Sequence, residues 1–254
     1  MIPGDDRGLL LGDGLFETLL AVDGELRAPD AHLDRLRRGC GVLGLAPPDA
    51  ATALAAMDTA LDVAGLRNGR AAVRLTLTAG SGRGLDRPSG GAPRLIATAS
   101  AYSPPTQAVS LATTAVRRNA DSPASRMKTL SYLDNVLARR EARAAGADEA
   151  LMLNTRGEIA CAAAANLFWI SGGRLFTPAL DCGVLDGTVR AEVLAAAGAM
   201  GVETGEVRAP SEALGEADAL FLTSSLMGVL AAASLDGRAL GGHPLIDALS
   251  RSCR

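Results

Sequence analysis

Alternating apolar and polar residues recur along the first hundred residues and predict β-strands. A tight turn at Asp23–Gly24 predicts a hairpin between the first two of these strands. Two segments with helical spacing separate the strands. The first opens at Pro29–Asp30, with Asp30 expected as its N-cap, and the second runs from about residue 49 to 64. The predicted strands are residues 15–22, 25–27, 71–79 and 93–101.

A stiff stretch, Ser103–Thr106, ends this part of the chain and predicts a domain boundary. We expect a small N-terminal α+β domain at 1–103, a linker at 104–106 and a larger C-terminal domain at 107–254. Strands and helices are mixed in the second half without regular βαβ alternation, which favours an α+β fold. Its predicted strands are 109–116, 149–153, 158–161, 166–170, 174–177 and 217–222, with a helix from about 186 to 200.

A further helix follows Lys128. Its apolar residues recur at helical spacing, so we expect them to form one buried face. The expected face contains Leu133, Val136, Leu137 and Ala144.

Composition excludes several classes of protein. The chain has 254 residues and a formal net charge of −3, which gives no basic surface for nucleic acid. No apolar run is long enough to span a bilayer and the N-terminus does not resemble a signal peptide, so we expect a cytoplasmic protein. Four scattered cysteines and two histidines offer little material for a disulfide framework, a metal site or a Ser-His-Asp triad.

Lys128 is the only lysine in the chain. A lysine amine next to a buried helix can lose its proton and act as a nucleophile, which an arginine cannot do. A single lysine in a loop is more often simply solvated. Its role therefore depends on the residues around it.

Other segments offer groups that bind anions. His32 and Arg35 lie three residues apart and share a helix face, which could equally be an ordinary exposed surface. Gly187 precedes a helix whose amino end would suit a phosphate. The hydroxyl residues Thr223–Ser225 follow a predicted strand and could bind the same phosphate or merely cap the next segment. The glycine-rich loop at 80–84 lacks the spacing of a P-loop or a dinucleotide motif, but its Arg83 could bind a carboxylate.

Taken together, these segments resemble the class IV aminotransferase family, the fold-type IV enzymes that use pyridoxal phosphate. The resemblance covers nearly the whole chain, and five motifs occur in the family's order. They are Gly12–Thr18, His32–Leu36, Lys128–Leu133, Leu185–Arg190, where Asp186 replaces the usual proline, and Thr223–Ser225.

The resemblance implies a role for each motif. Lys128 would be the Schiff-base lysine and Tyr132 would support the phenolate oxygen of the cofactor. Arg35 and the Gly187–Val189 turn would bind its phosphate. Ser225, with Ser224 beside it, would supply a phosphate hydroxyl, while Phe16 and Arg83 are candidate substrate contacts. The family also implies two α+β domains with the cofactor in the cleft between them, and a homodimer.

One position departs from the family. A glutamate that pairs with the pyridine nitrogen of the cofactor usually follows the turn glycine by four residues, and counting from Gly157 that position is Cys161. A neutral thiol cannot hold this nitrogen protonated as a carboxylate does. The sequence therefore predicts that transamination is weakened more than elimination, unless another residue or a water fills the role.

The reaction itself remains a choice between members of the family. The segment Ala164–Trp169 is most similar to aminodeoxychorismate lyases, which release pyruvate from 4-amino-4-deoxychorismate to give 4-aminobenzoate. The alternative is an aminotransferase that moves an amino group between a D- or branched-chain L-amino acid and a 2-oxo acid. A third possibility is a non-catalytic relative that has lost its cofactor, which only Cys161 suggests.

Overall fold

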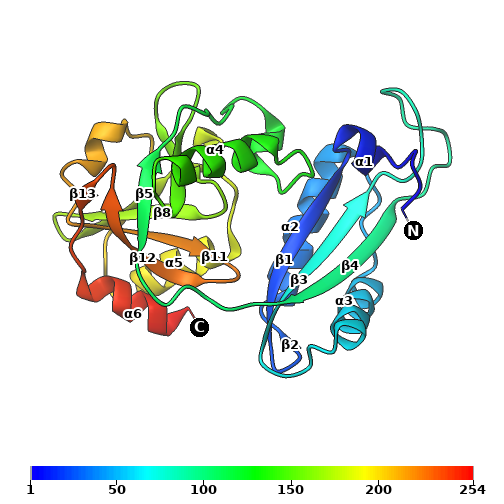
Figure 1. The fold of residues 1–254 in the computed structure, drawn as a ribbon, viewed down its shortest axis with the longest axis horizontal. Coiled ribbons are helices and arrows are strands. Elements are labelled where there is room, and N and C mark those ends of the chain that lie inside the picture. The colour runs from blue at the N-terminus through cyan, green and yellow to red at the C-terminus, as the bar shows by residue number, and fades with distance from the viewer. Residues whose placement is uncertain (1, 254) are drawn as a thin grey trace. The chain divides into compact units, whose positions relative to one another are not determined.

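The computed structural model describes residues 2–253, which form two compact units (Figure 1). The first unit takes the chain up to Pro104 and adds Met127–Ser131. The second takes Pro105–Arg126 and continues from Tyr132. The lysine segment, which the sequence analysis assigned to the second domain, thus groups with the first unit. Over the described residues, no helix has the length and apolar character needed to cross a membrane.

The first unit is an antiparallel sheet covered by helices, with strand order β2-β1-β3-β4. Residues of β3 alternate strictly, so Val73, Leu75 and Leu77 face the core while Arg74 and Thr76 face the other way. The elements are α1 (Arg7–Leu11), β1 (Gly14–Val22), β2 (Glu25–Leu26), α2 (Pro29–Leu43), α3 (Ala50–Ala64), β3 (Arg70–Thr78) and β4 (Arg94–Ala101).

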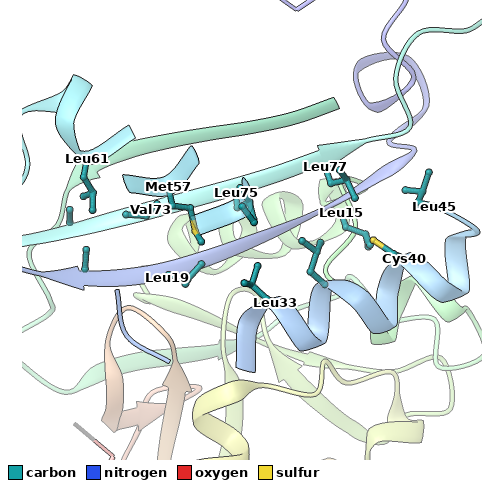
Figure 2. Packing of buried hydrophobic residues seen from close by; sticks show 14 of the residues in the cluster. Leu15, Leu19, Leu33, Cys40, Leu45, Met57, Leu61, Val73, Leu75 and Leu77 are labelled. Carbon is teal, nitrogen blue, oxygen red and sulfur yellow. The ribbon is translucent and has the colours of Figure 1, made fainter. Parts of the chain in front are cut away.

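Two helices close the core of this sheet. Figure 2 shows Leu15 of β1 beside Cys40 of α2, within a cluster that also contains Met57 and Leu61 of α3. Asp49 caps α3 as its position suggests, because its side chain accepts from the N–H of Thr52. The prediction for α2 was wrong: its N-cap is Ala28, in the left-handed region, and Asp30 lies in the first turn. A proline at the first helical position needs no N–H there, which explains the shift.

The lysine segment is joined to the first unit by backbone hydrogen bonds. Phe16 donates its N–H to the carbonyl oxygen of Lys128 at 2.8 Å, and Leu130 donates to Gly14 at 3.0 Å. One edge of β1 is paired with β3 throughout, and β2 covers the other edge only at Ala21 and Val22. The lysine segment therefore pairs with the part of β1 that β2 leaves open.

The second unit is a nine-stranded mixed sheet with strand order β10-β9-β8-β11-β12-β5-β6-β7, and β13 pairs with β12. Its strands are β5 (Val109–Thr113), β6 (Glu149–Leu153), β7 (Ile159–Ala162), β8 (Asn166–Ser171), β9 (Arg174–Pro178), β10 (Thr204–Val207), β11 (Ala219–Ser224), β12 (Gly228–Leu235) and β13 (Arg238–Ala239). Its helices are α4 (Leu133–Ala144), α5 (Thr188–Ala199) and α6 (Pro244–Ser252), and short 3₁₀ turns lie at Pro123–Arg126, Leu180–Cys182 and Ser211–Leu214.

Both faces of this sheet are apolar. Phe168 of β8 and Phe221 of β11 are register partners, and their rings stack at 4.9 Å on the face that α5 and α6 cover. Leu167, Trp169 and Leu222 point to the opposite face and form a second cluster with β5 and β6. Burial on both sides explains why these strands read as apolar runs rather than as alternating patterns.

Helix α4 buries a different face from the one predicted. Ala138 and Ala142 are fully buried against β6, whereas Leu133 and Val136 are 67% and 58% exposed. The helix packs closely on the sheet through its small residues, so its larger apolar residues stay outside. The prediction of a buried leucine and valine face was wrong.

Candidate active site

The side chain of Lys128 lies in a cluster of charged and aromatic residues within the first unit. Its Nζ is 4.3 Å from the centre of the Phe16 ring, and the guanidinium carbon of Arg74 is 3.6 Å from the same centre. We call this group the lysine cluster. Its members are Phe16, Glu17, His32, Arg35, Arg74 and Lys128.

The surroundings of Lys128 favour the neutral form of its amine. Its pKa falls to about 8, chiefly because burial disfavours the charged form. The positive charges of Arg35 and Arg74 lower it further, and the negative charge of Glu17 opposes them. A large fraction of the amine is therefore neutral near pH 8, and a neutral amine can form a covalent bond to a carbonyl carbon.

Glu17 joins two of the other members. It is 1% exposed, and its oxygens accept from Nε and Nη2 of Arg35 at 2.9 and 2.6 Å. Nδ1 of His32 lies 2.7 Å from Oε2 of the same carboxylate. Burial raises the pKa of Glu17, but the hydrogen bonds from Arg35 and His32 outweigh it and hold the pKa below its usual range. The carboxylate is therefore ionised.

Sequence reasoning found Lys128, Arg35 and Phe16 but not Glu17 or Arg74. Glu17 belongs to a strand with apolar neighbours at Leu15 and Leu19 on the same face. A charged residue on the apolar face of a strand is the signal that could have found it. Arg74 occupies the solvent side of the alternating β3 pattern, and nothing in the sequence sets it apart.

A second group of candidate residues surrounds the amino end of α5 in the second unit. Gly187 is the N-cap residue and provides no side-chain cap. A Cβ atom on Gly187 would lie 2.0 Å from Oδ1 of Asn166, so only glycine fits. Asn166 is held in place because its Nδ2 donates to the carbonyl oxygen of Leu185 at 2.9 Å. We call Asn166 and Gly187–Val189 the glycine turn.

Thr223 and Ser224 are the last two residues of β11, and Thr223 faces this side of the sheet. Thr223 pairs with Asn166 across the strands and shares the face of Phe221, against which α5 packs. Its Oγ1 is buried and has no hydrogen-bond partner among the described residues. Ser224 accepts from the N–H of Met227 at 3.4 Å, while Ser225 follows the end of the strand. An unsatisfied buried hydroxyl beside a helix amino end suits an anion.

Cys161 is buried in β7 and packs with Cys182 and Val184. Burial raises the pKa of its thiol, the positive charge of Arg118 opposes this, and the negative charge of Glu149 adds to it. The thiol is therefore neutral at physiological pH. Among the described residues, the guanidinium of Arg118 donates to neutral oxygens, those of Gly183, Asn135 and Ser125.

Two predicted residues lie outside these groups. Tyr132 is the N-cap residue of α4, without a side-chain cap, and belongs to the second unit. Arg83 is exposed, and its loop is fixed by other arginines rather than by Arg83. Arg7 donates to the carbonyl oxygens of Gly84, Leu85 and Asp86 at 2.8 to 3.1 Å. These hydrogen bonds connect the segment that follows Arg83 to α1.

Comparison with known proteins identifies the family. The model of amino-transferase class IV matches residues 14–235. The chain belongs to the class IV aminotransferase family. The family uses pyridoxal phosphate, and one solved relative is a PLP-bound form. This family member is therefore a pyridoxal-phosphate-dependent enzyme with the fold-type IV architecture, as the sequence predicts.

Relatives of this enzyme carry two kinds of name. A protein of Methanocaldococcus jannaschii, provisionally named a branched-chain-amino-acid aminotransferase, is 33% identical over 92% of this chain and 83% of its own length. Aminodeoxychorismate lyase of Bacillus subtilis is 30% identical over 89% of this chain and 78% of its own. A solved structure from Legionella pneumophila, provisionally named a 4-amino-4-deoxychorismate lyase, has a TM-score of 0.92 and 30% identity, and the match covers 98% of this chain and 92% of that one.

Each unit contains residues that suit one part of the cofactor. In the first unit, the neutral amine of Lys128 suits a carbonyl carbon. In the second unit, the glycine turn and the unsatisfied Thr223 hydroxyl suit a phosphate group. Cys161 does not fit as an acidic partner for the ring nitrogen, because its thiol stays neutral.

Proposed function

We propose that this enzyme is a 4-amino-4-deoxychorismate lyase, which eliminates pyruvate to give 4-aminobenzoate. The observation that carries the proposal is the neutral, buried thiol of Cys161 where the family is expected to have a glutamate. A site without an acidic partner for the ring nitrogen of the cofactor favours elimination over transamination. The reason is that transamination depends more on delocalising negative charge into the cofactor ring. The names of the Bacillus and Legionella relatives support the same reaction.

The cofactor-binding roles follow the two groups of residues. Lys128 would hold the cofactor covalently, and Tyr132 would support its phenolate oxygen. Arg35, Gly187, Thr188, Val189, Ser224 and Ser225 would bind its phosphate. Bound pyridoxal phosphate supplies a conjugated ring that delocalises the electron pair left when a bond to the substrate Cα breaks. The Lys128 amine would be the base that removes the Cα proton, and its pKa of about 8 suits this task near neutral pH.

Substrate contacts belong to the first unit. Phe16 lies beside the Lys128 amine, and Arg83 offers a guanidinium for a carboxylate. Arg74 offers a second guanidinium, held over the Phe16 ring and hydrogen-bonded to Thr76 through Nε at 3.2 Å.

The second candidate function is transamination of a D- or branched-chain L-amino acid with a 2-oxo acid. The Methanocaldococcus relative, at 33% identity, favours it. Three parallel incubations distinguish the reactions: aminodeoxychorismate, D-alanine with 2-oxoglutarate, and L-leucine with 2-oxoglutarate. We expect 4-aminobenzoate and pyruvate from the first and at least about tenfold slower keto-acid formation from the others. Keto acid from leucine without 4-aminobenzoate would make the enzyme a transaminase.

The glycine turn gives a prediction on cofactor affinity. A Cβ at position 187 must displace the Asn166 side chain, so we expect Gly187→Ala to weaken binding of pyridoxal phosphate by about tenfold and to lower Tm. Gly198→Ala in the same helix is the matched control, since a Cβ there meets no atom within 4 Å, and it should leave affinity unchanged. Absorbance titration and thermal melting measure both effects. Equal affinities for the two variants would remove the turn from the phosphate site.

We further propose that the enzyme is a cytoplasmic homodimer. Exposed leucines on α1 support an interface in the first unit, with Leu9, Leu10 and Leu11 exposed by 67%, 52% and 43%. Leu133 and Val136 on α4 support one in the second unit. All four cysteines are free thiols, which suits a reducing compartment.

A further inference from the structure

Within the lysine cluster, Glu17 forms hydrogen bonds with both Arg35 and His32. Arg35 approaches its carboxylate side-on, through Nε and Nη2, so the carboxylate fixes the plane of the guanidinium. The 2.7 Å contact with His32 requires that Nδ1 of the imidazole carries a hydrogen, which it donates to Oε2. The carboxylate is thus hydrogen-bonded from two positions of α2, and both partners are buried.

Glu17 also supplies a negative charge that acts on Lys128 together with two positive charges. Lys128 is influenced by Arg35 from α2, by Arg74 from β3 and by Glu17 from β1. Removing this buried carboxylate would take away the charged group that accepts two hydrogen bonds from Arg35, and the loss of a partner by a buried charge is costly. It would also increase the positive potential at the amine of Lys128.

We propose that Glu17 is a positioning residue for cofactor binding. Together with His32 it fixes the Arg35 guanidinium that receives the cofactor phosphate, and its charge offsets the two guanidiniums beside the Lys128 amine. This inference rests on the proposed roles of Lys128 and Arg35. Glu17 would act through Arg35 and Lys128.

The first test measures how strongly the full-length protein prefers pyridoxal phosphate to pyridoxal, which lacks the phosphate. The ratio of the two Kd values isolates the phosphate contacts, since both compounds can bond to Lys128. We expect Glu17→Gln to reduce this ratio by about tenfold, because Arg35 is no longer held in position. An unchanged ratio in Glu17→Gln would overturn the positioning role.

The second test measures the pKa of the Lys128 amine from the pH dependence of its reaction with pyridoxal, trapped by borohydride. Glu17 raises this pKa in the native protein, so Glu17→Gln should move it downward from about 8. Glu17→Asp keeps the charge but shortens the side chain, so it should retain the native pKa while losing part of the phosphate preference. If the glutamine variant does not fold, the aspartate variant still tests the proposal, because an unchanged Kd ratio there would contradict it.

Two controls separate this inference from the proposed function. Asp58→Asn removes an exposed carboxylate that pairs with Arg67 in the same unit, and it should change neither quantity. Arg35→Met should abolish the phosphate preference. If Arg35→Met keeps the preference, the phosphate role of Arg35 is wrong and the proposal fails with it. If Arg35→Met loses the preference but both Glu17 variants keep it, only the inference about Glu17 is wrong.

Discussion

We expect Lys128→Ala to abolish both turnover and covalent attachment of the cofactor. Lys128 is the only lysine in the chain, so no second side-chain amine can replace it. The neighbouring Arg35 and Arg74 keep their protons at any accessible pH and cannot act as nucleophile or base. We expect kcat to fall by at least about a thousandfold, which is the range for loss of a catalytic base. Steady-state kinetics and mass spectrometry after borohydride reduction measure the two effects.

Lys128→Arg is the matched variant, since it keeps a positive charge over the Phe16 ring but not a titratable amine. It should be as inactive as the alanine variant while keeping the fold. Native turnover should rise as the pH passes through about 8, where the Lys128 amine loses its proton. Cofactor that is still trapped by borohydride in Lys128→Ala would refute the assignment.

We expect Cys161→Glu to increase transamination. A carboxylate at this position would hold the ring nitrogen of the cofactor protonated, as a neutral thiol cannot, and so stabilise negative charge in the ring. Arg118, whose charge already acts on the Cys161 thiol and whose hydrogen bonds go to neutral oxygens, would favour the ionised carboxylate. We expect the half-reaction with an amino acid, followed by absorbance of the bound cofactor, to accelerate by at least about tenfold.

Cys161→Gln is the control for size. It introduces a side chain of similar length without a charge, so it should leave the half-reaction near its native rate. If glutamine accelerates the reaction as much as glutamate, the effect is one of packing and the electronic argument is wrong. If neither variant accelerates it, another group already supplies the proton at the ring nitrogen.

Strand β3 could be predicted because one face is apolar and the other polar, as in Val73, Arg74 and Leu75. Reasoning from the pattern of apolar residues gave the wrong buried face for helix α4. Apolar spacing predicted that Leu133 and Val136 would be buried, but close packing on β6 selected Ala138 and Ala142 instead. Side-chain size at a helix contact depends on the distance to the partner element, which the helix's own sequence does not contain.

The candidate site was predictable in part. Lys128 stands out by composition, and His32 and Arg35 by their shared helix face. Their common partner Glu17 is 15 and 18 residues away along the chain and on a different element. Only the packing of α2 on β1 joins them, so a local pattern could not show the pair. The close approach of Asn166 to Gly187 is hidden for the same reason.

The pairing of the lysine segment with β1 affects how this protein is made. The backbone passes three times between the two units, at residues 104–105, 126–127 and 131–132. The N–H of Phe16 and the carbonyl of Gly14 obtain their partners only from residues more than a hundred positions later. During synthesis the ribosome must therefore add the first stretch of the second unit, Pro105–Arg126, before the first unit can complete its sheet. Such distant pairing raises contact order, which slows folding. Part of one edge of β1 also remains unpaired in the nascent N-terminal unit until the lysine segment has been synthesised.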